Sequence, residues 1–172
     1  SESEVALSVV ALGDSIQVEI QPKWNLLSLP LLPSDTKTLL QLLKDADGKQ
    51  LISEDAWQWM AEGKRYKAIT KGVPSKVGFW VYGQVNEPRM TRQIPGAFQD
   101  GSQSLYKGWN LIGPVEDIPV SQVLEDQKTL SPVWGWHAGE QRYYRISDED
   151  KLKRGKGYWI FVNAECEVNL AK

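Results

Sequence analysis

Eight tryptophans divide the chain into two copies of one sequence pattern, and this duplication constrains the fold more than any other feature. Each half carries four of the eight, and the residues around them agree in order. The matched segments are 24–27 (WNLL) with 109–112 (WNLI), 57–59 (WQW) with 134–136 (WGW), 65–69 (RYKAI) with 142–146 (RYYRI), and 78–82 (GFWVY) with 157–161 (GYWIF). We therefore predict two tandem homologous repeats, residues 1–95 and 96–172, related by an approximate two-fold axis and either sharing one core or packing side by side.

Alternating and short apolar runs separated by Gly and Pro predict strands over most of each repeat. We expect strands at 15–20, at each WNL segment, at 77–81 and 157–162, and at 89–94 and 166–170. Apolar residues at helical spacing predict one short helix per repeat, around Leu39–Leu43 and Val120–Leu124. Expected caps are Ser34 or Asp35 for the first helix and Asp117 or Ser121 for the second. The fold class is mainly β, sandwich-like or barrel-like, with one short helix in each repeat.

A hairpin is predicted in each copy, with its turn at Gly63 or Gly139. In the first hairpin, this turn places Trp59 opposite Tyr66 and Trp57 opposite Ala68. In the second, it places Trp136 opposite Tyr143. Cross-strand aromatic pairs stabilise a hairpin by up to about 1 kcal/mol each.

Composition excludes some classes of partner. The formal net charge of -2 argues against nucleic acid, because phosphate backbones are bound by clustered Lys and Arg. Apolar runs fall short of the roughly 18 residues that a membrane span needs, so no span is predicted. The chain begins at Ser1 without Met or a signal peptide, and we interpret it as a mature protein or a piece of a larger polypeptide.

Metal, cofactor and catalytic patterns are weak. The segment 45–48 (DADG) resembles part of a calcium loop, but the later ligands are out of register, which favours a turn at a helix end. The segment 153–157 (KRGKG) precedes a β-type aromatic run and not a helix, so it predicts a turn into a strand and no phosphate loop. His137 is the only histidine and Cys166 the only cysteine, so neither a zinc site nor a catalytic Cys-His pair is expected. We predict no cofactor, and we interpret Cys166 as a buried structural thiol whose pKa its acidic neighbours raise.

The candidate ligand-binding residues are the paired aromatics of the two hairpins: Trp57, Trp59, Tyr66, Trp134, Trp136 and Tyr143. Tryptophans at i and i+2 project from the same face of a strand. If that face is exposed, the indoles form a platform for sugar rings or for an apolar partner. If it is buried, they are core, which is the interpretation we favour. An intermediate case places one tryptophan of a pair in the core and the other at an interface.

The strings at 107–113 (KGWNLIG), 133–136 (VWGW) and 154–159 (RGKGYW) resemble a repeated module whose hallmarks are GWNLIS, a WxW or YxW hairpin, and PGKGYWV. That module occurs in large secreted and cell-surface proteins of bacteria and archaea. The resemblance covers nearly the whole chain, once per copy. The first copy departs from it at Pro22-Lys23 and at 75–77 (SKV), which bears on loops more than on fold. The resemblance implies an extracellular or cell-surface location and a non-enzymatic role.

Three functional hypotheses follow. The preferred one is a non-catalytic extracytoplasmic module for adhesion or assembly through protein contacts. The alternative is a carbohydrate-binding module that uses the paired tryptophans, so the expected partner is a protein or a polysaccharide at a cell surface. The third is a glycoside-active enzyme, which is disfavoured because no Asp or Glu adjoins the aromatic landmarks in both copies. An exposed, coplanar row of rings would favour sugar, and buried rings would favour protein contacts or structure.

Overall fold

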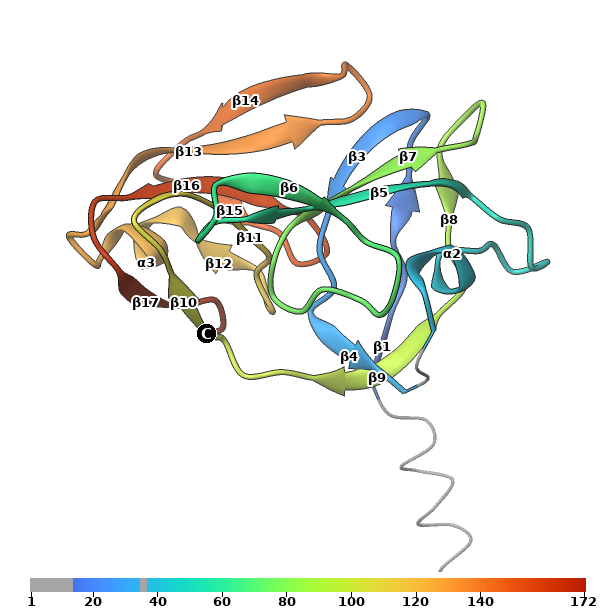
Figure 1. Ribbon diagram of the computed structural model, residues 1–172, viewed down its shortest axis with the longest axis horizontal. Helices are drawn as coiled ribbons and strands as arrows, with labels where there is room; N and C mark the ends of the chain where they lie inside the picture. The colour runs from blue at the N-terminus through green and yellow to red at the C-terminus, as the bar shows by residue number, and fades with distance from the viewer. Residues whose placement is uncertain (1–13, 35–36) are drawn as a thin grey trace, which may run out of the picture.

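The computed structural model describes residues 14–34 and 37–172, and it confirms a mainly β, sandwich-like fold (Figure 1). Each repeat contributes one antiparallel four-stranded sheet, and the two sheets have the same strand order. In the first repeat the order is β3 (Lys23–Leu27), β7 (Phe79–Gly83), β5 (Ile52–Met60) and β6 (Arg65–Ala68). In the second it is β11 (Gly108–Ile112), β16 (Tyr158–Val162), β13 (Thr129–His137) and β14 (Arg142–Ile146).

Both hairpins have the predicted register. Trp57 lies opposite Ala68 and Trp59 opposite Tyr66 across β5 and β6. Trp136 lies opposite Tyr143 across β13 and β14. The turn residues Lys64 and Gln141 take positive φ values of 50° and 53°, so the two turns are also equivalent in backbone conformation.

Shorter strands surround the two main sheets, and two of the predicted strands are broken. The short strands are β1 (Ser15–Ile16), β2 (Glu19–Ile20), β4 (Leu31–Pro33), β8 (Arg89–Met90), β9 (Ile94–Phe98), β10 (Ser102–Leu105), β12 (Ile118–Pro119), β15 (Lys151–Leu152) and β17 (Cys166–Asn169). The single strands predicted at 15–20 and 89–94 are wrong. Each is split where the register shifts by one residue, between the pair Ile16 and Ile94 and the pair Glu19 and Met90. At this point the hydroxyl of buried Thr91 accepts a hydrogen bond from the Val18 amide, at 3.0 Å. Strand β9 pairs with β1 and β4 and runs across the predicted boundary between residues 95 and 96.

Each repeat has its own apolar core, covered by a short helix. Helix α2 (Leu39–Leu42) buries Leu39 and Leu42 in the first core, and α3 (Val120–Leu124) buries Val120 and Val123 in the second.

The predicted helix caps are wrong. The cap of α2 is Thr38, which forms a capping box with Gln41. Helix α3 has Pro119 at its N-cap and no side-chain cap. Asp117 instead accepts a hydrogen bond from the backbone N–H of Arg154, at 3.0 Å. Of the other expected caps, Asp35 lies outside the described residues.

A third cluster, which we call the shared cluster, joins the two repeats. Its buried members are Leu26, Trp80 and Leu111, and the partly buried tryptophans packed against them are Trp24, Trp59, Trp136 and Trp159. Both repeats contribute equivalent residues, except that Trp109, the counterpart of Trp24, is 42% exposed and lies outside the cluster. The repeats therefore have separate cores and also a common one.

Strand edges also cross between the repeats beside this cluster. Leu27 of β3 forms an isolated bridge with Lys156, and Ile112 of β11 forms the equivalent bridge with Val77. The chain just before β7 thus pairs with the second repeat, and the chain just before β16 pairs with the first. Gly78 and Gly157 face each other here, and a Cβ added at Gly157 would lie 3.1 Å from the Gly78 Cα. The close approach of the two backbones requires glycine on both sides.

Lys156 is the one charged residue of these bridging pairs, and its counterpart in the first copy is Val77. Burial lowers the pKa of the Lys156 ammonium, and Glu19, which lines the same cavity with His137 and Tyr144, opposes the shift. We expect Lys156→Met to leave the free energy of unfolding unchanged or to raise it by up to about 1 kcal/mol, because it removes a desolvated charge. Chemical denaturation at several pH values checks this.

The sign of the pH dependence is fixed by the lowered pKa. The unfolded chain binds the Lys156 proton more tightly than the folded chain, so the wild type gains stability as pH rises through the folded-state pKa. Any advantage of Lys156→Met should therefore shrink at alkaline pH. A loss of stability in this variant at neutral pH would show that the ammonium has a stabilising partner.

Candidate binding site: two aromatic grooves

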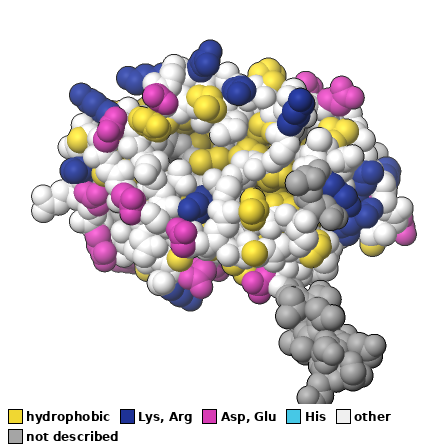
Figure 2. Space-filling view, turned by 60° about the horizontal axis from the view of Figure 1, so that its bottom comes forward, with side chains coloured by type: hydrophobic (Ala, Val, Ile, Leu, Met, Phe, Trp, Pro, Cys, Tyr) yellow, Lys and Arg dark blue, Asp and Glu magenta, His cyan; other side chains and the backbone are white. Residues whose placement is uncertain are grey.

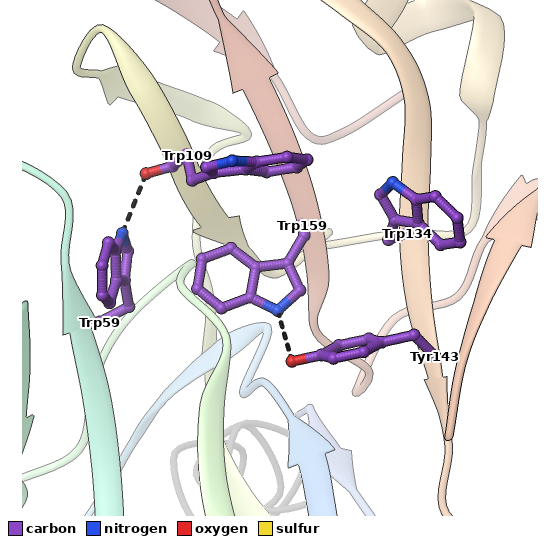
Figure 3. Close-up of a pocket in the computed structure, with 5 residues that line it drawn as sticks. All are labelled: Trp59, Trp109, Trp134, Tyr143 and Trp159. Carbon is purple, nitrogen blue, oxygen red and sulfur yellow. Dashed lines mark hydrogen bonds between the residues drawn. The ribbon is translucent and has the colours of Figure 1, made fainter. Parts of the chain in front are cut away.

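All eight tryptophans line two open grooves on the main sheets. The first, which we call the Trp109 groove, has a volume of about 500 Å³ and is lined by Trp59, Trp109, Trp134, Tyr143 and Trp159 (Figure 3). In Figure 3 the ring of Trp159 faces the viewer between the edge-on rings of Trp109 and Tyr143, with Trp59 and Trp134 on either side. Four of these residues come from the second repeat, and Trp59 comes from the first.

The second groove, which we call the Trp24 groove, is the two-fold equivalent of the first. Its volume is about 540 Å³, and its lining residues are Trp24, Trp57, Tyr66, Trp80, Trp136 and Tyr143. Here Trp136 and Tyr143 come from the second repeat and the others from the first. Because Tyr143 lines both, the grooves are neighbours on one aromatic surface.

One tryptophan of each hairpin, Trp59 or Trp136, packs on the other repeat, which explains why each groove is composite. The Trp59 ring lies 5.5 Å from that of Trp159, and the Trp136 ring lies 5.0 Å from that of Trp80. The interplanar angles of the groove rings in contact lie between 70° and 88°. Edge-to-face packing of this kind gives slots between perpendicular rings and no flat row.

Two equivalent indole hydrogen bonds fix the arrangement. Trp59 donates from Nε1 to the Trp109 carbonyl, and Trp136 donates from Nε1 to the Trp24 carbonyl, each at 2.9 Å. Each bond ends on a backbone carbonyl in an edge strand of the opposite repeat: Trp59 binds β11, and Trp136 binds β3. Gln141 adds two contacts to the same residue, because its side chain accepts from the Trp24 amide at 3.0 Å and donates to the Trp24 carbonyl at 2.8 Å.

The remaining polar groups of the grooves are mostly donors. Among the described residues, the indole N–H groups of Trp24, Trp57, Trp109 and Trp134 form no hydrogen bond, so they remain available to a ligand. Tyr143 accepts from Trp159 Nε1 at 3.2 Å, which leaves its own proton free to donate. Burial raises the pKa of Tyr66 and Tyr143, so both hydroxyls stay protonated at neutral pH. Neither lining includes an Asp, Glu, Asn or Gln side chain.

Charge distinguishes the two grooves. Arg145 pairs with Trp134 in the register of β13 and β14, and directly opposite residues share a face of the sheet. The exposed Arg145 therefore lies at the rim of the Trp109 groove, and it forms no ion pair within the described residues. Its counterpart beside Trp57 is Ala68, so the Trp24 groove lacks this charge.

All six candidate residues predicted from the hairpins line the grooves. The structure does not bury them as the favoured core interpretation expected. Trp57 is 37% exposed and Tyr66 and Tyr143 are each 46% exposed, while Trp59, Trp134 and Trp136 are half-buried. The reason is that the repeat cores pack on the other face of the hairpins, through Ala56 in the first and through Val133 and Ile146 in the second. The intermediate case is met only in part: Trp59 and Trp136 pack at the interface between the repeats, but neither member of a pair is buried.

The sequence prediction missed four lining residues, Trp24, Trp80, Trp109 and Trp159. Their repetition in both copies was a signal that could have identified them. Repetition could not have identified Gln141, because the first copy has Lys64 at the equivalent turn position.

The other candidate motifs have structural roles. Asp45 Oδ1 accepts from the amides of Asp47 and Lys49, which confirms a turn after helix α2. Gly155, with φ of 86°, forms the turn into β16. Cys166 is half-buried and not fully buried as predicted. Its pKa is raised, first by burial and then by Asp126, and its sequence neighbours are not the cause. No group of metal-binding side chains occurs among the residues that the structure describes.

Figure 2 shows a second view of the surface, in which hydrophobic side chains gather in a hollow near the middle of the face and charged side chains lie around it. Within residues 14–34 and 37–172, no helix is long and apolar enough to cross a membrane.

Compared with protein-family models, with curated proteins and with solved structures, the chain shows no significant match to any of them.

Proposed function

We propose that this chain is a non-catalytic extracytoplasmic module of a larger polypeptide, which mediates adhesion or assembly by binding a segment of another protein in its aromatic grooves. The observation that supports this most directly is that eight tryptophans line two open grooves and that only Trp80 among them is buried. Tryptophan and tyrosine are the residues most enriched at the energetic centres of protein interfaces. The location outside the cytoplasm rests on the sequence resemblance alone.

A carbohydrate-binding role is the second candidate, because exposed indoles stack on sugar rings. Two features favour protein contacts over it. The rings in contact stand at 70° to 88° to each other, so they present no coplanar platform. Every sugar hydroxyl is also a donor, and the groove linings offer only tyrosine oxygens as side-chain acceptors.

Peptide and glycan arrays, probed with the whole chain, compare the two candidates directly. We expect binding to a subset of array peptides and to no neutral oligosaccharide. Tyr143→Ala should weaken peptide binding about 10-fold or more, because Tyr143 lines both grooves. Tyr144→Ala is the matched control, since Tyr144 is the next residue, is similarly exposed at 41%, and points to the opposite face of β14.

Because Tyr143 packs against Trp80 and Trp136, its removal could also disturb the fold. Trp134→Ala is the second variant, since no ring contact of Trp134 occurs among the described residues. Equal binding by the wild type, Tyr143→Ala and Trp134→Ala would contradict the proposal. Glycan hits that both variants lose, without peptide hits, would replace it by the carbohydrate-binding role.

A further inference from the structure

We infer that the Trp109 groove binds a proline-rich segment in the polyproline II conformation that carries an acidic residue beside its prolines. This inference rests on the proposed function and specifies the chemistry of its ligand. Three properties of the groove support it: the angle between its rings, its hydrogen-bonding groups, and the charge at its rim.

The shape of the groove suits side chains that insert between rings. The Trp109 ring stands at 88° to that of Trp159, and the Trp59 ring at 73° to it. Figure 3 shows Trp159 between the edge-on rings of Trp109 and Tyr143, which leaves slots open on its face. A polyproline II chain presents compact apolar rings at a regular spacing of three residues per turn, and aromatic-lined grooves recognise it in this way.

The hydrogen-bonding groups of the groove match a chain that has acceptors and few donors. Trp109 and Trp134 have free indole N–H groups, and the Tyr143 hydroxyl can donate once it has accepted from Trp159. The carbonyls of a polyproline II chain make no internal hydrogen bonds, and proline has no N–H that would need an acceptor. A β-strand would leave its backbone amides without carboxylate or side-chain amide acceptors on this lining.

The charge at the rim selects the residue beside the prolines. Arg145 lies opposite Trp134 on the groove face, is exposed, and has no carboxylate partner within the described part of the chain. No Asp or Glu lines the groove. A carboxylate on the ligand would form a charge-assisted pair with the guanidinium, whereas a lysine there would be repelled. The Trp24 groove has Ala68 in this place and lacks the preference.

Three twelve-residue peptides test the inference with the whole chain, by calorimetry and by tryptophan fluorescence. One repeats Pro-Pro-Glu, one repeats Pro-Pro-Lys, and one repeats Ser-Gly-Glu. We expect the Pro-Pro-Glu peptide to bind at least 10-fold more tightly than either of the others. Trp134→Ala should reduce its affinity about 10-fold, and added salt should weaken it as well.

Arg145→Ala should abolish the preference for the Pro-Pro-Glu peptide over the Pro-Pro-Lys peptide. Lys67→Ala is the matched control, because it also removes one exposed positive charge, from the face of β6 opposite to Tyr66. It should leave both affinities unchanged. A charge preference that survives in Arg145→Ala, or that Lys67→Ala removes equally, would overturn the assignment of Arg145.

The failure of this inference differs from the failure of the proposed function. Array peptides that bind through Tyr143 and Trp134 but lack proline would refute the polyproline ligand and leave the protein-binding role intact. If the Pro-Pro-Glu peptide does not bind, but an oligogalacturonate does so and requires Arg145 and Trp134, the ligand is an acidic saccharide and both proposals fall.

Discussion

Trp80→Ala should lower the free energy of unfolding by about 3–5 kcal/mol, the range for large-to-small changes of buried aromatic residues. Trp80 is only 8% exposed, and its ring lies 5.0 Å from Trp136, 6.2 Å from Tyr143 and 6.4 Å from Trp24. The variant would therefore leave a cavity bordered by both repeats. Equilibrium denaturation followed by far-ultraviolet circular dichroism measures the change.

Trp57→Ala is the matched control for this prediction. It removes the same side chain from the same groove, but Trp57 is 37% exposed and contacts no other ring within the described residues. Its cost should be clearly smaller than that of Trp80→Ala, because Trp57 buries less apolar surface. If the two variants were equally stable, the shared cluster would contribute little to folding, and the repeats would be held together by their backbone bridges.

Gly157→Val should destabilise the whole molecule by about 1–3 kcal/mol or more, through overpacking between the repeats. A Cβ at this position would lie 2.9 Å from Leu26 Cγ and 3.1 Å from the Gly78 Cα, and the second of these contacts is backbone. A backbone contact cannot be relieved by a rotamer change. Since the contact belongs to both repeats, we expect a single unfolding transition at lower denaturant, and not the loss of the second repeat alone.

Gly63→Ala is the control for the glycine change. Its nearest neighbour would be the flexible Arg65 side chain, 3.4 Å away, and Gly63 lies in an exposed turn. The variant should unfold within about 0.5 kcal/mol of the wild type. Two separate transitions in Gly157→Val, one unchanged from the wild type, would show that the repeats fold independently.

Much of the local structure could be predicted because it depends on short-range chemistry. The pairing of Trp59 with Tyr66 and of Trp136 with Tyr143 followed from turn position, since hairpin register is set by the turn. The helix caps could not be predicted in this way. Thr38 and Ser34 are equivalent by residue type, and the choice between them depends on where β4 ends and the chain reaches the core.

The candidate site was predicted in its hairpin residues, but its other four tryptophans and its form were not. The spacing at i and i+2 predicts that Trp57 and Trp59 share one face of their strand, and the same spacing in the second copy predicts this for Trp134 and Trp136. Whether that face is covered depends on which distant elements pack over it, and local sequence patterns do not specify such contacts. Each groove also needs the tryptophan of the other copy, and that contact joins residues such as Trp59 and Trp159 that lie far apart in the chain.

The sequence by itself determined the duplication, the mainly β class and the aromatic composition of the site, because these follow from repetition, alternation and turn chemistry. Only the tertiary structure decided that Leu27 and Ile112 each form a backbone bridge with the other copy and that Gly78 and Gly157 are in contact. It also decided that eight tryptophans line two grooves. The physical reason is that β3 and β11 are edge strands with unpaired backbone groups, and the groups that pair with them come from the opposite repeat.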